Sequence, residues 1–398
     1  MGPPTYKRDL IPHTMKIDPY KHKERFLKWK EKVGENGISG ISKTNSDLIL
    51  RYIHDMEHGL NISFKSTKGC RSYTRLNTLK EKMIFFAKKF REIYDLDDIT
   101  AISEENLVLF FSRMRKGEIT RRDGKNYLST NYFVRIFKAF WHWHQKVNKK
   151  NGDEILDITE DLDARSEKPD WVYLTEEQVR ELCRKAKYEY EVLIMFLFDT
   201  GIRSPGELVN IRVADLYSDF KELHIRDEIS KTFGRRIKLM ICPELLKEYV
   251  KSKDLSNEDY LFPINPPTVN KYLQRLALRV LGDKKSLAGQ KYSELTMYDF
   301  RHCSCCYWLP RYKSESALKY RFGWKKSDKI HYYSELLGMK DTISEDDMFI
   351  DTTKTEMEQK IEKSHRENEM LKERINSMEE QMKEILGLVR GLGEKVRQ

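Results

Sequence analysis

The most regular pattern in the sequence is a hydrophobic repeat near its C-terminal end. Between Met357 and Val396, apolar side chains recur at alternating steps of four and three residues. Such a repeat keeps one stripe of a helix apolar, which is typical of a coiled coil. Ile375 and Val389 at core positions, with polar Asn368 among them, favour two parallel strands. The sequence therefore predicts a coiled coil over residues 353–398, with a long single surface helix as the alternative.

Helical spacing also organises the sequence between residues 44 and 150. One stripe of large apolar side chains has steps of three or four residues: Leu76, Leu79, Met83, Phe86 and Phe90. Further segments of this kind predict a helical domain over 44–150. Residues 1–43 are polar, lysine-rich and contain prolines, so they are predicted as an extension. The acidic, polar stretch 151–171 is predicted as a linker to a second domain.

The charge balance points to a polyanionic partner. The 73 Lys and Arg residues exceed the 63 Asp and Glu residues, which leaves a formal charge of +10. Basic side chains are interleaved with the predicted helices, and five of them are candidate DNA contacts: Arg71, Arg75, Lys80, Arg135 and Lys138. The aromatic cluster of the same domain is predicted as hydrophobic core and not as a base-stacking platform: Phe137, Phe140, Trp141 and Trp143.

Membrane and metal chemistry are not expected. The longest apolar run, 192–198, is far shorter than the roughly 18 residues that a membrane-spanning helix needs. We therefore expect a cytoplasmic, nucleoid-associated protein. His302 is crowded by Cys303, Cys305 and Cys306, but adjacent helix positions face different directions, which disfavours a zinc site. Buried reduced thiols are the favoured interpretation, and no metal or cofactor is predicted.

A second domain begins near residue 172. Thr175 and Gln178 form the pattern of a helix-capping box, and an apolar helix follows. Two β-rich runs, 223–229 and 236–241, flank a hairpin-like segment, and the pattern is helical again as far as about residue 336. The whole chain is therefore predicted to be α-rich, of the α+β class, with a mixed α/β domain over 172–340.

The second domain holds candidates for phosphodiester cleavage. A side-chain nucleophile needs cations on the phosphate oxygens and a proton donor for the leaving oxygen. The segment TGIRSPGEL contains Arg203 and Glu207, and LTMYDFRH contains Tyr298 and Arg301. Phe-Gly-Trp follows at 322–324, with Tyr333 nine residues after the tryptophan. The order and spacing of these segments resemble those of the tyrosine recombinases, or phage-type integrases.

The resemblance implies catalytic roles for six residues: Arg203, Lys231, Tyr298, Arg301, Trp324 and Tyr333. The arginines would bind the phosphate, Lys231 would protonate the leaving oxygen, and the tryptophan would donate a hydrogen bond. Glu207 would orient the first arginine by an ion pair. Tyr333 would be the nucleophile, with adjacent Tyr332 as the alternative.

One position departs from the family pattern. Tyr298 stands where most members have histidine, although tyrosine resembles archaeal-type integrases at this place. A phenol, with an ordinary pKa of about 10, is a poor base at neutral pH. Tyr298 is therefore expected to position the phosphate or the nucleophile, with His302 as a supporting residue.

The implied architecture is a helical core-binding domain and a catalytic domain that close on double-stranded DNA. The implied function is a site-specific recombinase or integrase that works through a 3′-phosphotyrosine, without metal or nucleotide. Self-association as a dimer in solution or a tetramer on DNA would use the coiled coil. Two alternatives stay open: a type IB topoisomerase-like enzyme that relaxes DNA, and a catalytically weakened DNA-binding protein of the same fold.

Overall fold

We analysed a computed structural model of the chain. It describes residues 16–62, 69–121, 123–127, 129–165, 170–312 and 314–337, together with single positions between 371 and 382. The chain divides into two compact units, 1–330 and 331–398. None of the helices in these described ranges is long and apolar enough to cross a membrane.

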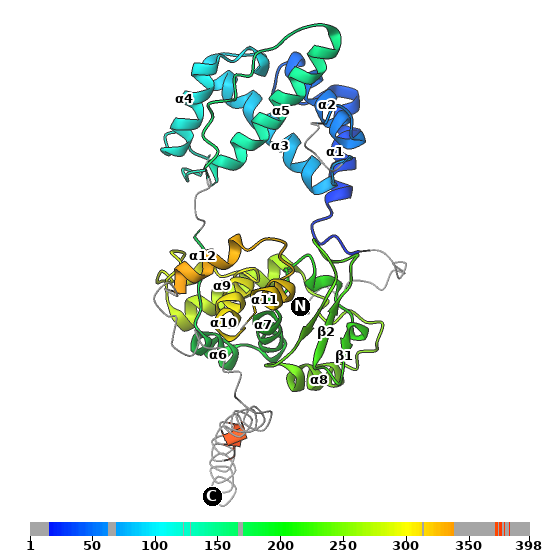
Figure 1. Ribbon diagram of the computed structural model, residues 1–398, viewed down its shortest axis with the longest axis vertical. Helices are drawn as coiled ribbons and strands as arrows, with labels where there is room; N and C mark the ends of the chain where they lie inside the picture. The colour runs from blue at the N-terminus through cyan, green and yellow to red at the C-terminus, as the bar shows by residue number, and fades with distance from the viewer. Residues whose placement is uncertain are drawn as a thin grey trace, which may run out of the picture. The chain divides into compact units, whose positions relative to one another are not determined.

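The N-terminal part of the first unit is a helical domain built on an aromatic core. Its helices are α1 (His22–Asn36), α2 (Lys43–His58), α3 (Tyr73–Tyr94), α4 (Glu104–Arg115) and α5 (Thr130–Asn151) (Figure 1). Serine side chains cap three of these helices by accepting a backbone N–H in the first turn: Ser42, Ser72 and Ser103. The four aromatic residues predicted as core are buried, so that prediction is confirmed: Phe137, Phe140, Trp141 and Trp143.

The predicted boundary of this domain is wrong at its N-terminal side. Helix α1 lies inside the segment 1–43 that was expected to be an extension. Phe26 and Val33 on α1 are buried in the same core as α2 and α3. The hydrophobic stripe of α1 is short and set among lysines, so its composition resembled that of a solvated segment.

The second domain surrounds one helix whose central residues, 192–198, are all apolar. The helices are α6 (Glu176–Lys185), α7 (Tyr188–Thr200), α8 (Pro243–Ser252), α9 (Pro266–Leu281), α10 (Asp299–Trp308), α11 (Glu315–Phe322) and α12 (Asp328–Leu337). Helix α7 packs against α6, α8 and α10. Since neighbours cover it on several sides, α7 can be apolar around its whole circumference. The capping box at Thr175 and Gln178 is present at the start of α6, as predicted.

A small antiparallel sheet completes this domain. The strands β1 (Leu216–Tyr217), β2 (Glu222–Ile225) and β3 (Arg235–Lys238) pair in the order β1-β2-β3. Leu223 pairs with Ile237, and Ile225 pairs with Arg235. These four side chains are buried, so a charged residue occupies an inward-facing position of β3. The sheet confirms the predicted α-rich, α+β class, although its strands are shorter than the predicted β-rich runs.

The tail falls mostly outside the described residues. The predicted coiled coil spans 353–398, and only single positions from 371 to 382 are described there, all of them helical. The apolar side chains among them are more than half exposed: Leu371, Ile375, Met378 and Met382. Their steps of four, three and four residues place them on one face of a helix.

Candidate active site

The site is built around the C-terminal end of α7. Gly201 follows this helix with a φ of +57°, in the left-handed region that glycine adopts most readily. A Cβ atom at Gly201 would lie 2.3 Å from the Phe322 ring and 2.8 Å from Ser304 Oγ. The carbonyl of Gly201 accepts a hydrogen bond of 2.5 Å from Arg301 Nη1. The glycine therefore lets a second segment of the chain approach the helix end closely.

Arg203 and Glu207 form the ion pair that the sequence predicted. Arg203 Nη1 lies 2.7 Å from Glu207 Oε1, and the Arg203 backbone N–H donates to Glu207 Oε2 at 3.0 Å. The glutamate is 2% exposed. Because the carboxylate holds both the backbone and the side chain of Arg203, it fixes the direction of the guanidinium.

Arg235 is a member of the site that the sequence analysis missed. Its side chain is fully buried, and Nη2 lies 2.9 Å from Glu207 Oε2. A second bond of 3.2 Å joins Arg235 Nη1 to Glu207 Oε1. A signal was present in the sequence, since Arg235 occupies an inward position in the alternation with Ile237 and Leu239. We call Arg203, Arg235, Arg301 and Glu207 the arginine cluster.

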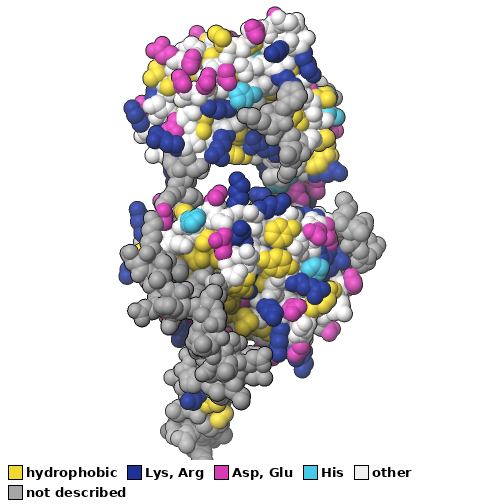
Figure 2. Space-filling model, viewed as in Figure 1, with side chains coloured by type: hydrophobic (Ala, Val, Ile, Leu, Met, Phe, Trp, Pro, Cys, Tyr) yellow, Lys and Arg dark blue, Asp and Glu magenta, His cyan; other side chains and the backbone are white. Residues whose placement is uncertain are grey.

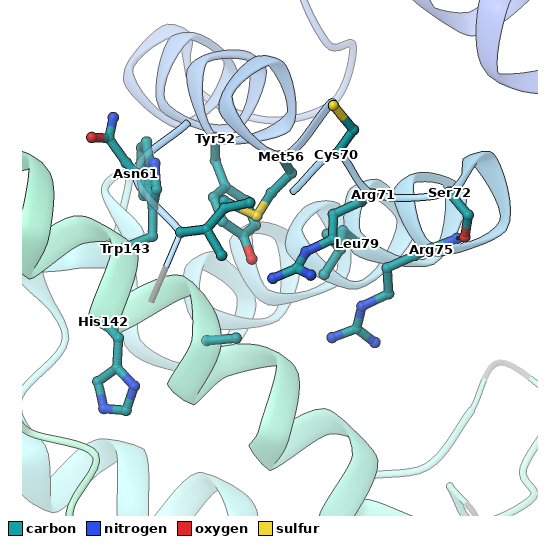
Figure 3. A pocket seen from close by; sticks show the side chains of 12 residues that line it. Tyr52, Met56, Asn61, Cys70, Arg71, Ser72, Arg75, Leu79, His142 and Trp143 are labelled. Atoms are coloured by element: carbon teal, nitrogen blue, oxygen red, sulfur yellow. Dashed lines mark hydrogen bonds between the residues drawn. The ribbon is translucent and has the colours of Figure 1, made fainter. Parts of the chain in front are cut away.

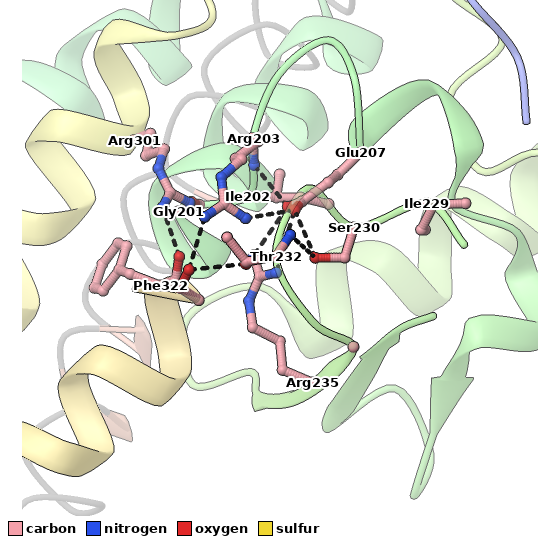
Figure 4. Close-up of polar contacts among 12 residues, drawn as sticks. Gly201, Ile202, Arg203, Glu207, Ile229, Ser230, Thr232, Arg235, Arg301 and Phe322 are labelled. Carbon is pink, nitrogen blue, oxygen red and sulfur yellow. Dashed lines mark hydrogen bonds and ion pairs between the residues drawn. The ribbon is translucent and has the colours of Figure 1, made fainter. Parts of the chain in front are cut away.

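The C-terminal end of α11 gathers the three arginines. Its last carbonyl groups have no partner within the helix, and this end carries the negative pole of the helix dipole. Gly323 and Trp324 donate their backbone N–H groups to the carbonyls of Tyr320 and Lys319. The next three carbonyls each accept from one arginine, as Arg321 O binds Arg235 Nε at 2.8 Å, Phe322 O binds Arg301 Nη2 at 2.6 Å and Gly323 O binds Arg203 Nη2 at 2.8 Å. Figure 4 shows these guanidinium groups converging beside Phe322.

Gly323 makes this convergence possible. It has a φ of +62°, and a Cβ atom there would lie 3.1 Å from Arg235 Nη1 and 3.3 Å from Arg203 Nη1. Any side chain at this position would therefore push into two of the three arginines. In the sequence Gly323 is part of the Phe-Gly-Trp segment, from which no role was predicted for the glycine.

The arginine cluster carries an excess of positive charge. Burial alone would raise the pKa of Glu207, but hydrogen bonds and charge from Arg235 and Arg203 outweigh it and lower the pKa to about 2. Burial, with the charge of Arg203 nearby, lowers the pKa of Arg301 to about 10, so it stays protonated at neutral pH. Arg203 and Arg235 share the Glu207 carboxylate, and Arg301 adds a third positive charge, which makes the cluster suited to an anion.

Lys231 lies in the segment 226–234 between β2 and β3. Its side chain is exposed and makes no hydrogen bond or ion pair to a residue of the described ranges. Both neighbours are attached to the site, because Ser230 Oγ donates to Glu207 Oε1 at 3.4 Å and Thr232 Oγ1 donates to Gly323 O at 2.9 Å. The structure therefore brings the backbone of Lys231 to the arginine cluster and leaves its ammonium group unbound.

The remaining candidates of this unit lie along α10 and after α11. Tyr298 precedes α10, is 47% exposed, and meets His302 edge-on at a ring separation of 5.2 Å. His302 also packs 4.7 Å from Trp171, which gives it a structural partner. Trp324 stacks on Phe322 at 4.9 Å, and its ring lies 6.0 Å from Arg301 Cζ. Trp324 is thus beside the arginine cluster.

Tyr333 belongs to the second compact unit, which begins at His331. It lies on α12, is 3% exposed, and its ring is 5.2 Å from that of Tyr332. Tyr332 is only partly buried. The two hydroxyls therefore occupy different environments on one helix.

The crowded cysteines are buried, as favoured by the sequence. Cys303, Cys305 and Cys306 lie inside the domain, and burial raises the pKa of each thiol. Among the described residues, no three His, Cys, Asp or Glu side chains gather in a way that could hold a metal ion. These thiols therefore pack as small apolar side chains.

The five basic candidates of the helical domain have different surroundings. Arg71 and Arg75 line an open cavity of about 770 Å³ between α2, α3 and α5, with Tyr52 and Trp143 among its other walls (Figure 3). Arg135 is exposed, and Lys138 donates to Glu160 O at 3.2 Å. Figure 2 shows Lys and Arg side chains interspersed with Asp and Glu on both domains.

Lys80 is a correction to the predicted DNA contacts. It is 7% exposed, and its ammonium group lies 4.7 Å from the centre of the Trp29 ring. Burial lowers the pKa of this lysine. A cation held over an aromatic ring inside the domain is not placed to meet a phosphate. The sequence pattern put Lys80 among surface lysines because the partner ring lies on α1, which the predicted domain left out.

Comparison with known proteins identifies the catalytic domain. Residues 172–340 match the sequence profile of the phage integrase family. The match spans the domain that holds every residue of the arginine cluster and the predicted nucleophile. No match was found among curated proteins.

The likeness to solved structures covers more of the chain than the profile match over residues 172–340 does. The integrase of the transposon Tn1549, in complex with transposon right end DNA, is 15% identical with a TM-score of 0.51, covering 74% of this chain and 94% of that one. XerH site-specific recombinase, in a post-cleavage complex with its palindromic difH substrate, is 14% identical with a TM-score of 0.53, covering 76% and 96%. A lambda integrase dimer bound to a core site is 13% identical with a TM-score of 0.53, covering 78% and 81%. The likeness extends into the helical domain. The profile match shows that residues 172–340 form a domain similar to the phage integrase family, and the solved structures show that the chain shares the fold of these DNA-bound recombinases.

Proposed function

We propose that the arginine cluster binds the scissile phosphate of double-stranded DNA and that Tyr333 attacks its phosphorus atom. The observation that carries this proposal is the convergence of three guanidinium groups on the end of α11, where Glu207 is paired with two of them. A phosphodiester gains negative charge on its non-bridging oxygens as the nucleophile approaches. Fixed guanidinium groups stabilise that charge without reorganising during the reaction.

The proposed reaction conserves the energy of the broken bond. The phenol oxygen of Tyr333 forms a bond to phosphorus and its proton passes to water, while the bond from phosphorus to the 5′ oxygen breaks. Lys231 gives a proton to that leaving oxygen, which produces a 5′-hydroxyl and a 3′-phosphotyrosine. A 5′-hydroxyl from a second duplex then attacks the phosphotyrosine and releases Tyr333. Trp324 adds one indole hydrogen bond to the bound phosphate, and Tyr298 positions it.

We infer that the tail joins protomers. Leu371, Ile375, Met378 and Met382 are exposed on one helical face, with the four-three spacing of a coiled-coil seam. Strand exchange needs two cut sites, so a dimer in solution and a tetramer on DNA suit the chemistry. We also infer that the protein associates with the nucleoid, where its DNA substrate lies.

A covalent adduct tests the assignment of the nucleophile. The wild-type chain would be incubated with a library of labelled duplexes that carry a nick beside the candidate site, so that the cut strand diffuses away and religation fails. We expect a denaturation-resistant adduct with wild-type protein and with Tyr332→Phe, and none with Tyr333→Phe. An adduct that survives in Tyr333→Phe and is lost in Tyr332→Phe would move the nucleophile by one residue.

The same duplexes separate the proposal from its two alternatives. Two differently labelled duplexes that exchange strands indicate recombination. Relaxation of a supercoiled plasmid without exchange would indicate a topoisomerase-like enzyme. Binding without any adduct on all bound duplexes would indicate a DNA-binding protein that has lost cleavage.

A further inference from the structure

The segment before α1 contacts the catalytic domain beside the loop that carries Lys231. Ile17 N–H donates to Asn210 Oδ1 at 2.6 Å, and Asn210 Nδ2 donates back to Ile17 O at 3.1 Å. The side-chain amide of Asn210 thus bonds both the backbone N–H and the backbone carbonyl of Ile17, as a neighbouring strand would. Lys16 Nζ donates to Ile229 O at 2.8 Å, two residues before Lys231.

Asn210 holds the segment before α1 against the catalytic domain. The residue is 2% exposed, and a buried amide requires hydrogen-bond partners because burying it without them is costly. Its own carbonyl accepts from Arg226 Nη2 at 2.9 Å, where the segment 226–234 begins. It also lies three residues after Glu207 of the arginine cluster. One buried residue therefore connects the N-terminal segment, the start of the loop and the phosphate site.

The loop 226–234 is attached to the rest of the domain at several points. One of them is the Ile229 carbonyl, which accepts a hydrogen bond from Lys16 and from no other residue of the described chain. Ser230 reaches Glu207, and Thr232 reaches Gly323 O. The Ile229 carbonyl, from a residue that is 2% exposed, accepts from Lys16. Lys231 lies between these attachments with an unbound ammonium group. These attachments limit where the backbone of Lys231 can lie, and therefore the position from which its side chain extends.

We propose that Lys16 is a positioning residue for Lys231, holding the loop 226–234 through the Ile229 carbonyl while Asn210 holds Lys16 in place through Ile17. The inference rests on the proposed role of Lys231 as general acid. Lys16 touches no reacting atom in this proposal. It acts only by limiting the orientations from which Lys231 delivers its proton.

Hydrogen exchange on the full chain without DNA tests whether Lys16 holds the loop. Ser230, Thr232 and Gly234 have backbone N–H groups bonded within this loop. We expect the peptide covering them to exchange about fivefold faster in Lys16→Met, the factor of one lost hydrogen bond. Lys16→Arg keeps a donor and is expected to match wild type. Lys251→Met is the control, because Lys251 is an exposed lysine of α8. Unchanged exchange in Lys16→Met would overturn the inference and leave the proposed function intact.

A sulfur leaving group tests whether the positioning concerns proton delivery. A duplex recovered as an adduct from the library would be prepared in two forms, with oxygen or with sulfur bridging phosphorus and the 5′ carbon. A thiolate leaves without protonation, so it needs no general acid. We expect Lys16→Met to cleave the oxygen form about fivefold more slowly than wild type and the sulfur form at the wild-type rate. Equal slowing on both forms would show a structural role instead and overturn the proposal.

The variant Lys231→Met tests the general-acid role on which the inference about Lys16 rests. It is expected to be slowed about a hundredfold on the oxygen form and restored by sulfur. If sulfur does not restore Lys231→Met, the general-acid assignment is wrong and the inference falls with it. If sulfur restores Lys231→Met but Lys16→Met is never slowed, only the inference falls.

Discussion

The arginine cluster and two other candidate residues, Lys231 and Tyr298, belong to one catalytic domain but are held very differently. Arg235 and Arg301 are 1% and 4% exposed, and each arginine of the cluster donates to a carbonyl at the end of α11. Lys231 is exposed, and Tyr298 is 47% exposed. The charges that would bind phosphate are thus fixed before DNA arrives, whereas Lys231 and Tyr298 are open to solvent.

Neutralising Glu207 should have the largest effect on stability and activity, because it removes the carboxylate of the buried arginine cluster. Glu207→Gln leaves Arg203 and Arg235 without their shared carboxylate. Breaking a buried ion pair costs about 3–5 kcal/mol, so the free energy of unfolding should fall by that amount. Urea unfolding of the full chain measures it. Adduct formation should fall with it, even under conditions in which the variant is folded.

Glu228→Gln is the matched control for that substitution. Glu228 is also paired with an arginine, but its side chain is 52% exposed. Exposed pairs contribute about 1 kcal/mol or less. Equal destabilisation by the two substitutions would mean that burial does not distinguish the arginine cluster from the surface.

Acid should remove the stabilisation that the buried Glu207 carboxylate provides. Folding lowers the pKa of Glu207 from 4.5 to about 2, so its contribution is complete above the unfolded value and is lost as the pH falls toward the folded one. Wild type should therefore lose about 2 kcal/mol more than Glu207→Gln between pH 6 and pH 3. Unfolding in urea at a series of pH values gives both curves. Parallel curves would contradict a charged, paired Glu207.

Lys231 is one of the exposed candidates, so its removal should lower activity without lowering stability. Lys231→Met should slow cleavage about a hundredfold, as expected for a lost general acid. Its free energy of unfolding should stay within about 0.5 kcal/mol of wild type, because the ammonium group is exposed. Adduct kinetics and urea unfolding test the two halves. A variant that unfolds more readily than wild type would show that the exposed Lys231 side chain contributes to the stability of the domain.

Tyr298 should give the smallest effect. Since a phenol is a poor base at neutral pH, Tyr298→Phe should slow adduct formation less than tenfold and leave stability unchanged. Tyr298→His should introduce a step in the pH–rate profile near pH 6.5, the ordinary pKa of an imidazole. A loss of a hundredfold or more in Tyr298→Phe would give the phenol a larger part in the chemistry than positioning.

Much of the catalytic domain could be predicted because its chemistry lies in short, local segments. Arg203 and Glu207 lie four residues apart in one segment, and the resemblance of that segment to the tyrosine recombinases predicted their ion pair. Gly201 marks the end of α7, because glycine readily adopts the left-handed conformation that ends a helix. The periodic apolar stripes of the helical domain likewise predicted a buried aromatic core.

Other features depend on contacts between distant segments, which spacing does not contain. Arg235 reads as one arginine among several in a hairpin, and only the register of β3 against β2 turns it inward. Lys80 reads as a surface lysine until α1 brings Trp29 over it. Helix α1 itself was missed because its lysines hide a short apolar stripe. In each case tertiary packing overrode the local pattern.

The three carbonyls at the end of α11 also have a consequence for synthesis on the ribosome. Arg203, Arg235 and Arg301 leave the exit tunnel before residues 321–323 do, and domains fold in the order in which they emerge. A nascent chain that lacks α11 therefore presents its guanidinium groups without their common acceptors. The arginine cluster, and with it the proposed phosphate site, is complete only when nearly the whole catalytic domain has been made.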